Sequence, residues 1–259
     1  MTIPGPRRAS VPRLYRYSSL STPERLEWLR IILQEHELYI PNLTQLNDKA
    51  DGRPKLAPMP GYRLASLLFD YWMLRNPNAP LVVRTREEFI IHYNMLRHGG
   101  KNLQRIFSTG LNDELKDNRI YSLSKRYDNM SMWAKYADNH TGYCLEFANE
   151  GPLFEHSMEV RYDDSLQVDI TNPEDRKGYW FYFKKTEWSN EEEVRLVLPP
   201  QMGSKVKIDP RWLTRIILGA DMTDAHRGVI RKWAVERKPQ LSVATAYYDE
   251  HNQSLRLVP

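Results

Sequence analysis

The amino-acid sequence predicts an α+β fold with a mainly antiparallel, split sheet and an inserted helical layer. In the second half of the chain, short strand-like runs far outnumber the helical ones, which does not suit an alternating βαβ array. In the first half, two helical patterns follow a long irregular stretch, as expected for an insertion. We expect a flexible arm over residues 1–13 and a single α+β domain over 14–259, with the helical insertion at about 61–110.

Local patterns at the N-terminus define the first elements. The arm is rich in Pro, Arg and Ser, and "LYRY" at 14–17 is typical of a short strand. A helix begins after it, because Ser21 or Thr22 can cap a helix that has Pro23 in its first turn. The apolar residues of this helix recur at helical spacing and are expected to pack on the sheet: Leu26, Leu29, Ile32 and Leu33.

The middle of the chain combines a second strand, an irregular loop and the insertion. "ELYI" at 37–40 predicts the strand, and the stretch at 41–60 is punctuated by Asn, Asp, Gly and Pro. Helical patterns follow at 61–75 and 86–97. Basic residues gather there, among them Arg84, Arg86, Arg97, Lys101 and Arg105. They suit either a solvated helix face or a surface for an acceptor macromolecule or a nucleic acid.

The second half is expected to form most of the sheet. A serine-containing strand at 120–125 is followed by a compact helix at 129–140 and a strand at 143–147. Further strands are expected at 156–162, 191–198, 205–209, 213–219, 241–249 and 254–258, with a helix near 223–237. Met132, Trp133 and Tyr136 fall on one side of the compact helix, where core packing accounts for them.

Composition excludes several classes of protein. Charged residues make up 27% of the chain, which argues against wholesale disorder, and no apolar run approaches the roughly 20 residues that span a bilayer. The N-terminus lacks the apolar core of a secretory signal, so we expect a cytoplasmic protein. The single cysteine, Cys144, excludes an internal disulfide. We expect no metal site, because His92 and His98 lack an acidic partner at ligand spacing.

Two serines alternate along the strand at 120–125. Ser122 and Ser124 share one face of this strand, while Tyr121 and Leu123 share the other. Small hydroxyl residues on a central strand leave room for a flat ligand and can hydrogen-bond its polar edge. The plainer interpretation is a strand with one face in water. Glu146 in "YCLEF" also has two interpretations. It either lines a ligand site or has a structural role, in which case it pairs with an arginine across the sheet.

Two glutamates and an arginine alternate in "WSNEEEVRLVLPP". A strand period of two places Glu191, Glu193 and Arg195 on one face. Like charges side by side repel, so one interpretation is an exposed face in which Arg195 and a basic residue of a neighbouring strand balance the acids. The other is a Glu-x-Glu pair at the mouth of a cleft, where both carboxylates act on a bound ligand.

Several of these stretches together resemble a bacterial family of unknown function. They are "LYRY", the serine strand, "MSMWAKYADNHTGYCLEF" and "WSNEEEVRL", and the resemblance spans roughly residues 14–219. The usual "F-N-D-P" loop of that family appears here as "LNDK" at 46–49. The order of the blocks is also similar to that of ADP-ribosyltransferases of the Arg–Ser–Glu type, which use NAD as a substrate and need no metal.

This second resemblance implies a site and an activity. Arg16 would contact a phosphate or ribose, and Ser122 and Ser124 would hold the nicotinamide end. One of Tyr15, Tyr17 and Tyr136 would stack on the ring. Glu193 would stabilise the cationic sugar of the transition state. Glu191 would orient or deprotonate the acceptor. The resemblance implies transfer of ADP-ribose to an unknown acceptor and is in keeping with a toxin or phage-defence effector.

Two other functions stay open on the sequence. One is a non-catalytic module that binds a nucleotide or a partner protein. The other is a hydrolase that uses the acidic pair on a phosphodiester, which would depend on a divalent cation. A chelator separates the hydrolase from ADP-ribosyl transfer, which needs no metal.

Overall fold

The computed structural model describes residues 5–45, 51, 55–57, 66, 69–70, 87–88, 116–169, 172, 179–249, 251 and 254–259. The predicted insertion at about 61–110 lies outside the described residues apart from positions 66, 69, 70, 87 and 88, which are helical. The basic residues Arg84, Arg86, Arg97, Lys101 and Arg105 also lie outside them.

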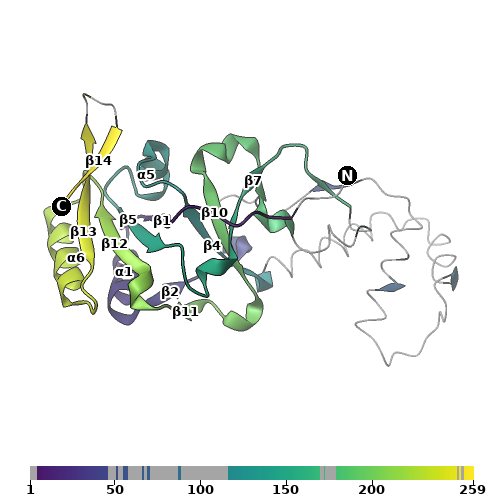
Figure 1. Cartoon of the computed structure of the whole chain (residues 1–259), viewed down its shortest axis with the longest axis horizontal. Helices are drawn as coiled ribbons and strands as arrows, with labels where there is room; N and C mark the ends of the chain where they lie inside the picture. Colours follow the sequence, from purple (N-terminus) through teal and green to yellow (C-terminus); the bar gives the residue numbers. More distant parts are fainter. Residues whose placement is uncertain are drawn as a thin grey trace.

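An eight-stranded sheet forms the centre of the described structure, with the strand order β14-β13-β12-β5-β1-β4-β10-β6 (Figure 1). Its strands are β1 (Arg13–Ser18), β4 (Arg119–Ser124), β5 (Tyr143–Ala148), β6 (Ser157–Glu159), β10 (Glu193–Leu198), β12 (Leu213–Leu218), β13 (Ser242–Asp249) and β14 (Ser254–Val258). Neighbouring strands run antiparallel except β12 and β13, which are parallel and are connected through helix α6 (Asp224–Glu236). The predicted α+β class is confirmed.

The two halves of this sheet meet between β1 and β4. Strand β1 pairs with β5 along the whole length of β1, from Arg13 opposite Ala148 to Ser18 opposite Tyr143. Towards β4 it pairs at Tyr15 opposite Ser124. The sheet is therefore continuous, but the backbone pairing between its two halves is short. This short pairing corresponds to the split that the sequence predicts.

Short strands pair outside the main sheet. Strand β2 (Glu37–Tyr39) pairs with β11 (Lys205–Lys207), so two predicted strands pair with each other and not with the main sheet. The predicted strand at 156–162 divides into β6 and β7 (Arg161–Tyr162), and β7 pairs with β9 (Phe183–Lys184). Strand β3 (Lys55–Leu56) pairs with β8 (Gln167–Val168). Short 3-10 helices connect the strands, at Leu43–Gln45, Phe154–His156, Tyr179–Tyr182, Thr186–Glu191, Pro200–Met202 and Pro210–Trp212.

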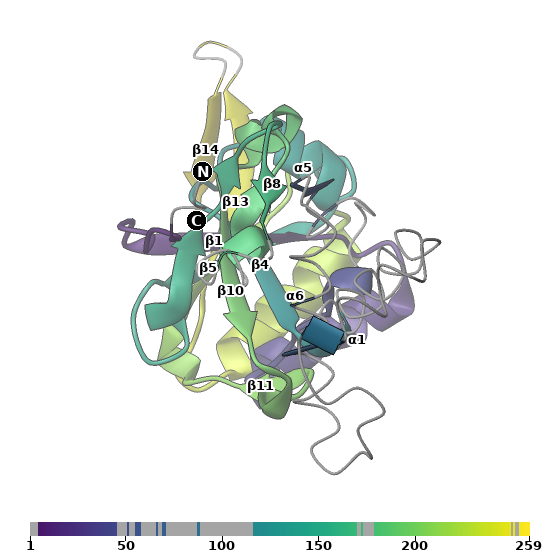
Figure 2. The ribbon, with the colours of Figure 1, turned by 90° about the vertical axis from the view of Figure 1, so that its right-hand side faces the viewer.

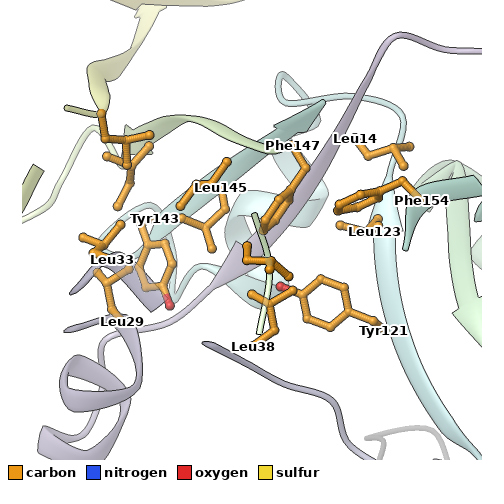
Figure 3. Packing of buried hydrophobic residues seen from close by; sticks show 14 of the residues in the cluster. Leu14, Leu29, Leu33, Leu38, Tyr121, Leu123, Tyr143, Leu145, Phe147 and Phe154 are labelled. Atoms are coloured by element: carbon orange, nitrogen blue, oxygen red, sulfur yellow. The ribbon is translucent and has the colours of Figure 1, made fainter. Parts of the chain in front are cut away.

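Two helices cover one face of the sheet and form the main core with it. Helix α1 (Pro23–Glu35) begins at the predicted proline, and α1 and α6 lie side by side (Figures 1 and 2), where Gln34 Nε2 donates to the Trp233 carbonyl oxygen at 2.8 Å. Leu29 and Leu33 are fully buried and lie near Tyr143 of β5 (Figure 3). Burial of each leucine contributes about 1.5–3 kcal/mol, so the predicted apolar stripe anchors α1.

Helix α5 (Met130–Tyr136) packs on the opposite face. The Asn129 side chain caps it by accepting from the backbone N–H groups of Ser131 and Met132. Trp133 is fully buried and meets the Tyr17 ring edge-on, with centroids 5.3 Å apart, which confirms its predicted place in the core. Gly142 then lets the chain turn into β5, since a Cβ atom there would lie 2.3 Å from the Ser18 carbonyl oxygen.

The described part of the N-terminal arm runs along the edge of the sheet. The backbone N–H of Glu159 donates to the carbonyl oxygen of Arg7 at 2.8 Å, and that of Ala9 donates to Ser157 at 2.9 Å. Asn149 Nδ2 donates to the carbonyl oxygens of Ala9 and Val11. Residues 7–11 are thus hydrogen-bonded to the fold, and the predicted flexibility of the arm stays a prediction.

Candidate active site

A row of polar side chains crosses one face of the central strands. Glu146 lies opposite Tyr15, Tyr15 lies opposite Ser124, and Ser124 lies opposite Glu193. Residues directly opposite each other in a sheet point to the same face. The row therefore joins residues of β5, β1, β4 and β10 on a single face, and the other face of these strands carries the core residues Leu14, Leu123, Leu145 and Val194.

The serine strand β4 alternates as the sequence predicts. Tyr121 and Leu123 belong to the main core, and the two serines face the polar side. Ser124 Oγ donates to the backbone carbonyl oxygen of Glu191 at 2.8 Å. Ser122 gives Glu193 a hydrogen bond that lowers the pKa of its carboxyl group. Both predicted serines therefore lie at the acidic pair.

The two glutamates come together, but not through strand alternation. Strand β10 begins at Glu193, and Glu191 is the last residue of the preceding 3-10 turn. Glu192 between them has a left-handed backbone, with φ of 43°, so the expected strand from 191 is wrong by two residues. The carboxylates still converge, because Lys184 Nζ lies 2.6 Å from Glu191 Oε2 and 3.0 Å from Glu193 Oε2.

These contacts belong to a line of alternating charges, which we call the charge chain. From its exposed end inward its members are Lys135, Glu191, Lys184, Glu193, Arg195 and Asp51. At the inner end Arg195 binds Glu193 through Nε (2.7 Å) and Nη2 (3.1 Å). It also binds Asp51 through Nη1 (2.9 Å) and Nη2 (2.6 Å), and its side chain is completely buried. Three cations thus alternate with three carboxylates.

The charge chain controls which of its carboxyl groups are ionised. Burial raises the pKa of Glu193, but Arg195 and Lys184 outweigh it and lower that pKa to about 2. Burial raises the pKa of Asp51 at the far end, against the attraction of Arg195. Burial lowers the pKa of Lys184, but Glu193 and Glu191 outweigh it and leave that pKa raised. Glu193 is therefore a carboxylate and Lys184 an ammonium at neutral pH.

Aromatic rings enclose the outer end of the charge chain. Lys135 Nζ lies 3.3 Å from Glu191 Oε1 and 3.2 Å from the centroid of the Trp188 ring. Tyr136 donates its hydroxyl to Glu191 Oε1 at 2.7 Å, and its stacking on a ligand ring stays a prediction. A cation above an indole ring is attracted by the electrons of the ring face. The exposed end of the charge chain is therefore an acidic and aromatic site that holds an ammonium group.

Two predicted ligand-binding residues do not join this site. Tyr15 is on the correct face, but its hydroxyl donates to Glu146 Oε2 at 3.4 Å and its ring packs against Tyr127. Arg16 points to the opposite face, because neighbouring residues of a strand alternate. There its Nη1 donates to the Ser122 carbonyl oxygen at 2.7 Å, and its guanidinium lies over the Tyr121 ring. Arg16 and the serine hydroxyls therefore lie on different faces.

Four residues of the site are not indicated by any sequence pattern: Lys184, Lys135, Trp188 and Asp51. Lys184 belongs to β9, a strand of two residues that no periodic pattern predicts. Asp51 lies 144 positions before Arg195 in a stretch expected to be an irregular loop. Among the described residues, no group of three or more His, Cys, Asp or Glu is arranged to hold a metal ion, and no helix is long and apolar enough to cross a membrane.

One family model matches part of this structure. The family DUF2971, described as a protein of unknown function, matches residues 132–196. The match runs from helix α5 through β5 to the first residues of β10, so it includes five of the six members of the charge chain. No curated protein and no solved structure matches the chain. The similarity to ADP-ribosyltransferases stays a prediction from the motif order.

Proposed function

We propose that the protein is an ADP-ribosyltransferase-like enzyme that cleaves NAD and transfers ADP-ribose to an acceptor. The observation that carries the proposal is the buried, ionised Glu193 beside the serine strand, within reach of the second carboxylate Glu191. Serine strand and acidic pair stand together in the order that the resemblance implies. The acceptor, a defence role and a cytoplasmic location are further parts of the same proposal.

The chemistry of NAD cleavage suits a buried carboxylate. When the bond between ribose C1′ and nicotinamide breaks, its electron pair leaves with nicotinamide, which becomes neutral. The sugar becomes cationic, and a carboxylate at that position stabilises the transition state more strongly in a dry site than in water. On this proposal Glu193 supplies that charge. The acceptor then forms a bond to C1′, and its proton passes to Glu191.

Ligand binding on this proposal requires a rearrangement at Lys184. Both oxygens of Glu193 accept hydrogen bonds, Oε1 from Arg195 and Oε2 from Arg195 and Lys184. The cationic sugar would take the place of the Lys184 ammonium on Oε2. Arg195 would keep Glu193 in position, since it also binds Asp51 and the Phe181 carbonyl oxygen.

The test measures NAD consumption by the purified protein in the presence of chelator, with cell lysate as the source of acceptor. We expect turnover that falls at least 100-fold in Glu193→Gln, because the variant removes the charge that stabilises the transition state. Glu187→Gln is the matched control, since Glu187 is exposed and contacts Lys185. Turnover that survives in Glu193→Gln would contradict the proposed role, and turnover that chelator abolishes would favour the hydrolase.

A non-catalytic module is the second candidate, and the saturation of Glu193 by two cations favours it. A carboxylate whose oxygens are both occupied can serve as a structural ion pair. This candidate predicts that NAD or ADP-ribose binds without being consumed. Calorimetric titration of the full chain with ADP-ribose, beside the turnover assay, separates the two candidates.

A further inference from the structure

A second polar centre lies on the same face of the sheet, away from the charge chain. At its middle is Glu146 of β5, whose side chain is 8% exposed. Its Oε1 accepts from Thr214 Oγ1 at 2.8 Å, and its Oε2 accepts from the Tyr15 hydroxyl at 3.4 Å. Arg13 approaches from β1 and Arg215 from β12. We call these five residues the two-arginine centre.

A bulge in β12 builds this centre. The register between β12 and β5 shifts between Leu213 and Arg215, so Thr214 is an extra residue in the strand. Leu213 points into the main core, and Arg215 lies opposite Glu146. Thr214 Oγ1 bonds both the carbonyl and the carboxylate of Glu146. Bulges of this kind redirect side chains, and they are common beside functional sites.

The two arginines hold more donors than Glu146 uses. Arg13 Nε lies 3.8 Å from Glu146 Oε1, and Arg215 Nη1 lies 3.9 Å from Oε2, both longer than a hydrogen bond. In the described part of the chain, Arg215 donates no hydrogen bond, and Arg13 donates one to the neighbouring Pro12 carbonyl oxygen. Their side chains are 36% and 45% exposed. One carboxylate between two guanidinium groups leaves a net positive charge facing solvent.

We propose that the two-arginine centre binds a phosphate-type oxyanion carried by a small ligand. The guanidinium group presents donors in a planar fork that matches two oxygens of a phosphate. The net single positive charge suits one phosphodiester oxyanion. Each arginine approaches a different oxygen of Glu146, and the guanidinium donors that Glu146 does not use can bind an anion. The proposal rests on this geometry and does not depend on the proposed NAD chemistry.

The centre lies on the same face of the sheet as the acidic pair, at a distance from it. Glu146 and Glu193 stand in one register row, three strands apart, which corresponds to about 14 Å across the sheet. Tyr15 lies between them in this row, and its ring packs against Tyr127. Tyr15 and Ser124 are buried there, so the two-arginine centre is a separate place on the same face.

The test titrates the full chain with two probes, ADP-ribose and inorganic phosphate, and follows the arginine Nε–H signals by NMR. We expect saturable binding of at least one probe that shifts the signals of Arg13 and Arg215. Arg215→Gln and Arg13→Gln should each weaken it about tenfold, by loss of charge-assisted hydrogen bonds. Arg211→Gln, which removes an exposed arginine paired with Asp209, is the matched control and should not change it.

The outcomes separate the possible ligands and the two proposals. Binding of both probes indicates a general phosphate site, and binding of ADP-ribose alone indicates a nucleotide phosphate. Glu193→Gln should keep this binding even where it abolishes NAD turnover. No saturable binding, or equal weakening by Arg211→Gln, would overturn the proposal. Thermal unfolding of each variant shows that it is folded, and the two single variants test the site independently.

Discussion

At the scale of single residues, Lys184 allows two acidic side chains to share a buried space. Glu191 and Glu193 are both about 5% exposed, and two carboxylates so close repel unless a cation lies between them. Lys184 Nζ binds one oxygen of each, and its own side chain is 7% exposed. The ammonium group of Lys184 thus neutralises the repulsion between the two carboxylates.

Lys184→Met keeps the length of the side chain and removes its charge. We expect a loss of about 3–5 kcal/mol in the free energy of unfolding, because two buried carboxylates lose their shared partner. Urea denaturation at neutral pH measures it. The adjacent Lys185→Met is the control, since Lys185 is 59% exposed and its contact with Glu187 is 3.7 Å long, so it should cost less than about 0.5 kcal/mol. Equal losses in both variants would rule out the shared role.

Glu193 makes stability depend on pH in the acid range. Its pKa is about 2 in the folded protein against an ordinary 4.5. A depressed pKa contributes stability that is fully present above 4.5 and is lost as the pH falls towards 2. Asp51 acts in the opposite direction, because burial raises its pKa.

The contribution of Glu193 is isolated by comparison with Glu193→Gln. Between pH 6 and pH 3, the wild-type protein should lose about 2 kcal/mol more unfolding free energy than the variant, since the variant has no proton to bind there. Denaturant unfolding across that range is the measurement. Parallel pH profiles of the two proteins would show that the Glu193 pKa is not depressed.

At the scale of elements, the sequence predicts what depends on local pattern and misses what depends on tertiary contact. Alternation along β4 places the serines and the core residues correctly, and helical spacing identifies α1. Alternation fails at Glu191, because the left-handed Glu192 interrupts the strand pattern. Alternation along β1 places Arg16 on the face opposite the serine hydroxyls. The resemblance to ADP-ribosyltransferases had implied that Arg16 belongs to the same site.

The elements that complete both polar centres are short or irregular. Strand β9 has two residues, yet it carries Lys184, and the inserted residue Thr214 makes two hydrogen bonds to Glu146. Alternation of apolar and polar residues over six positions predicts a strand. A strand of two residues or a single inserted residue is too short to leave such a pattern in the sequence. The expected arginine partner of Glu146 across the sheet is confirmed, with two arginines in place of one.

At the scale of the whole molecule, the joint between β1 and β4 connects the two halves of the sheet. One half, from β14 to β1, contains the two-arginine centre, and the other half, from β4 to β6, contains Glu193. Backbone pairing at this joint is short, at Tyr15 and Ser124. Arg16 adds a second connection by donating to the Ser122 carbonyl oxygen. The main core, which contains residues of both halves, also holds the two polar centres in position.

Arg16→Met tests whether this arginine joins the halves. We expect it to lower the free energy of unfolding by about 1–3 kcal/mol, because the Ser122 carbonyl oxygen loses a charged donor. Amide hydrogen exchange should quicken in β4 and β10 and stay unchanged in β5 and β12, since the loss falls at the joint. Arg13→Met, on the same strand but on the opposite face and more exposed, should leave exchange in β4 unchanged. Uniform acceleration across all eight strands would instead mean that the sheet opens as one unit, and that Arg16 has no special place at the joint.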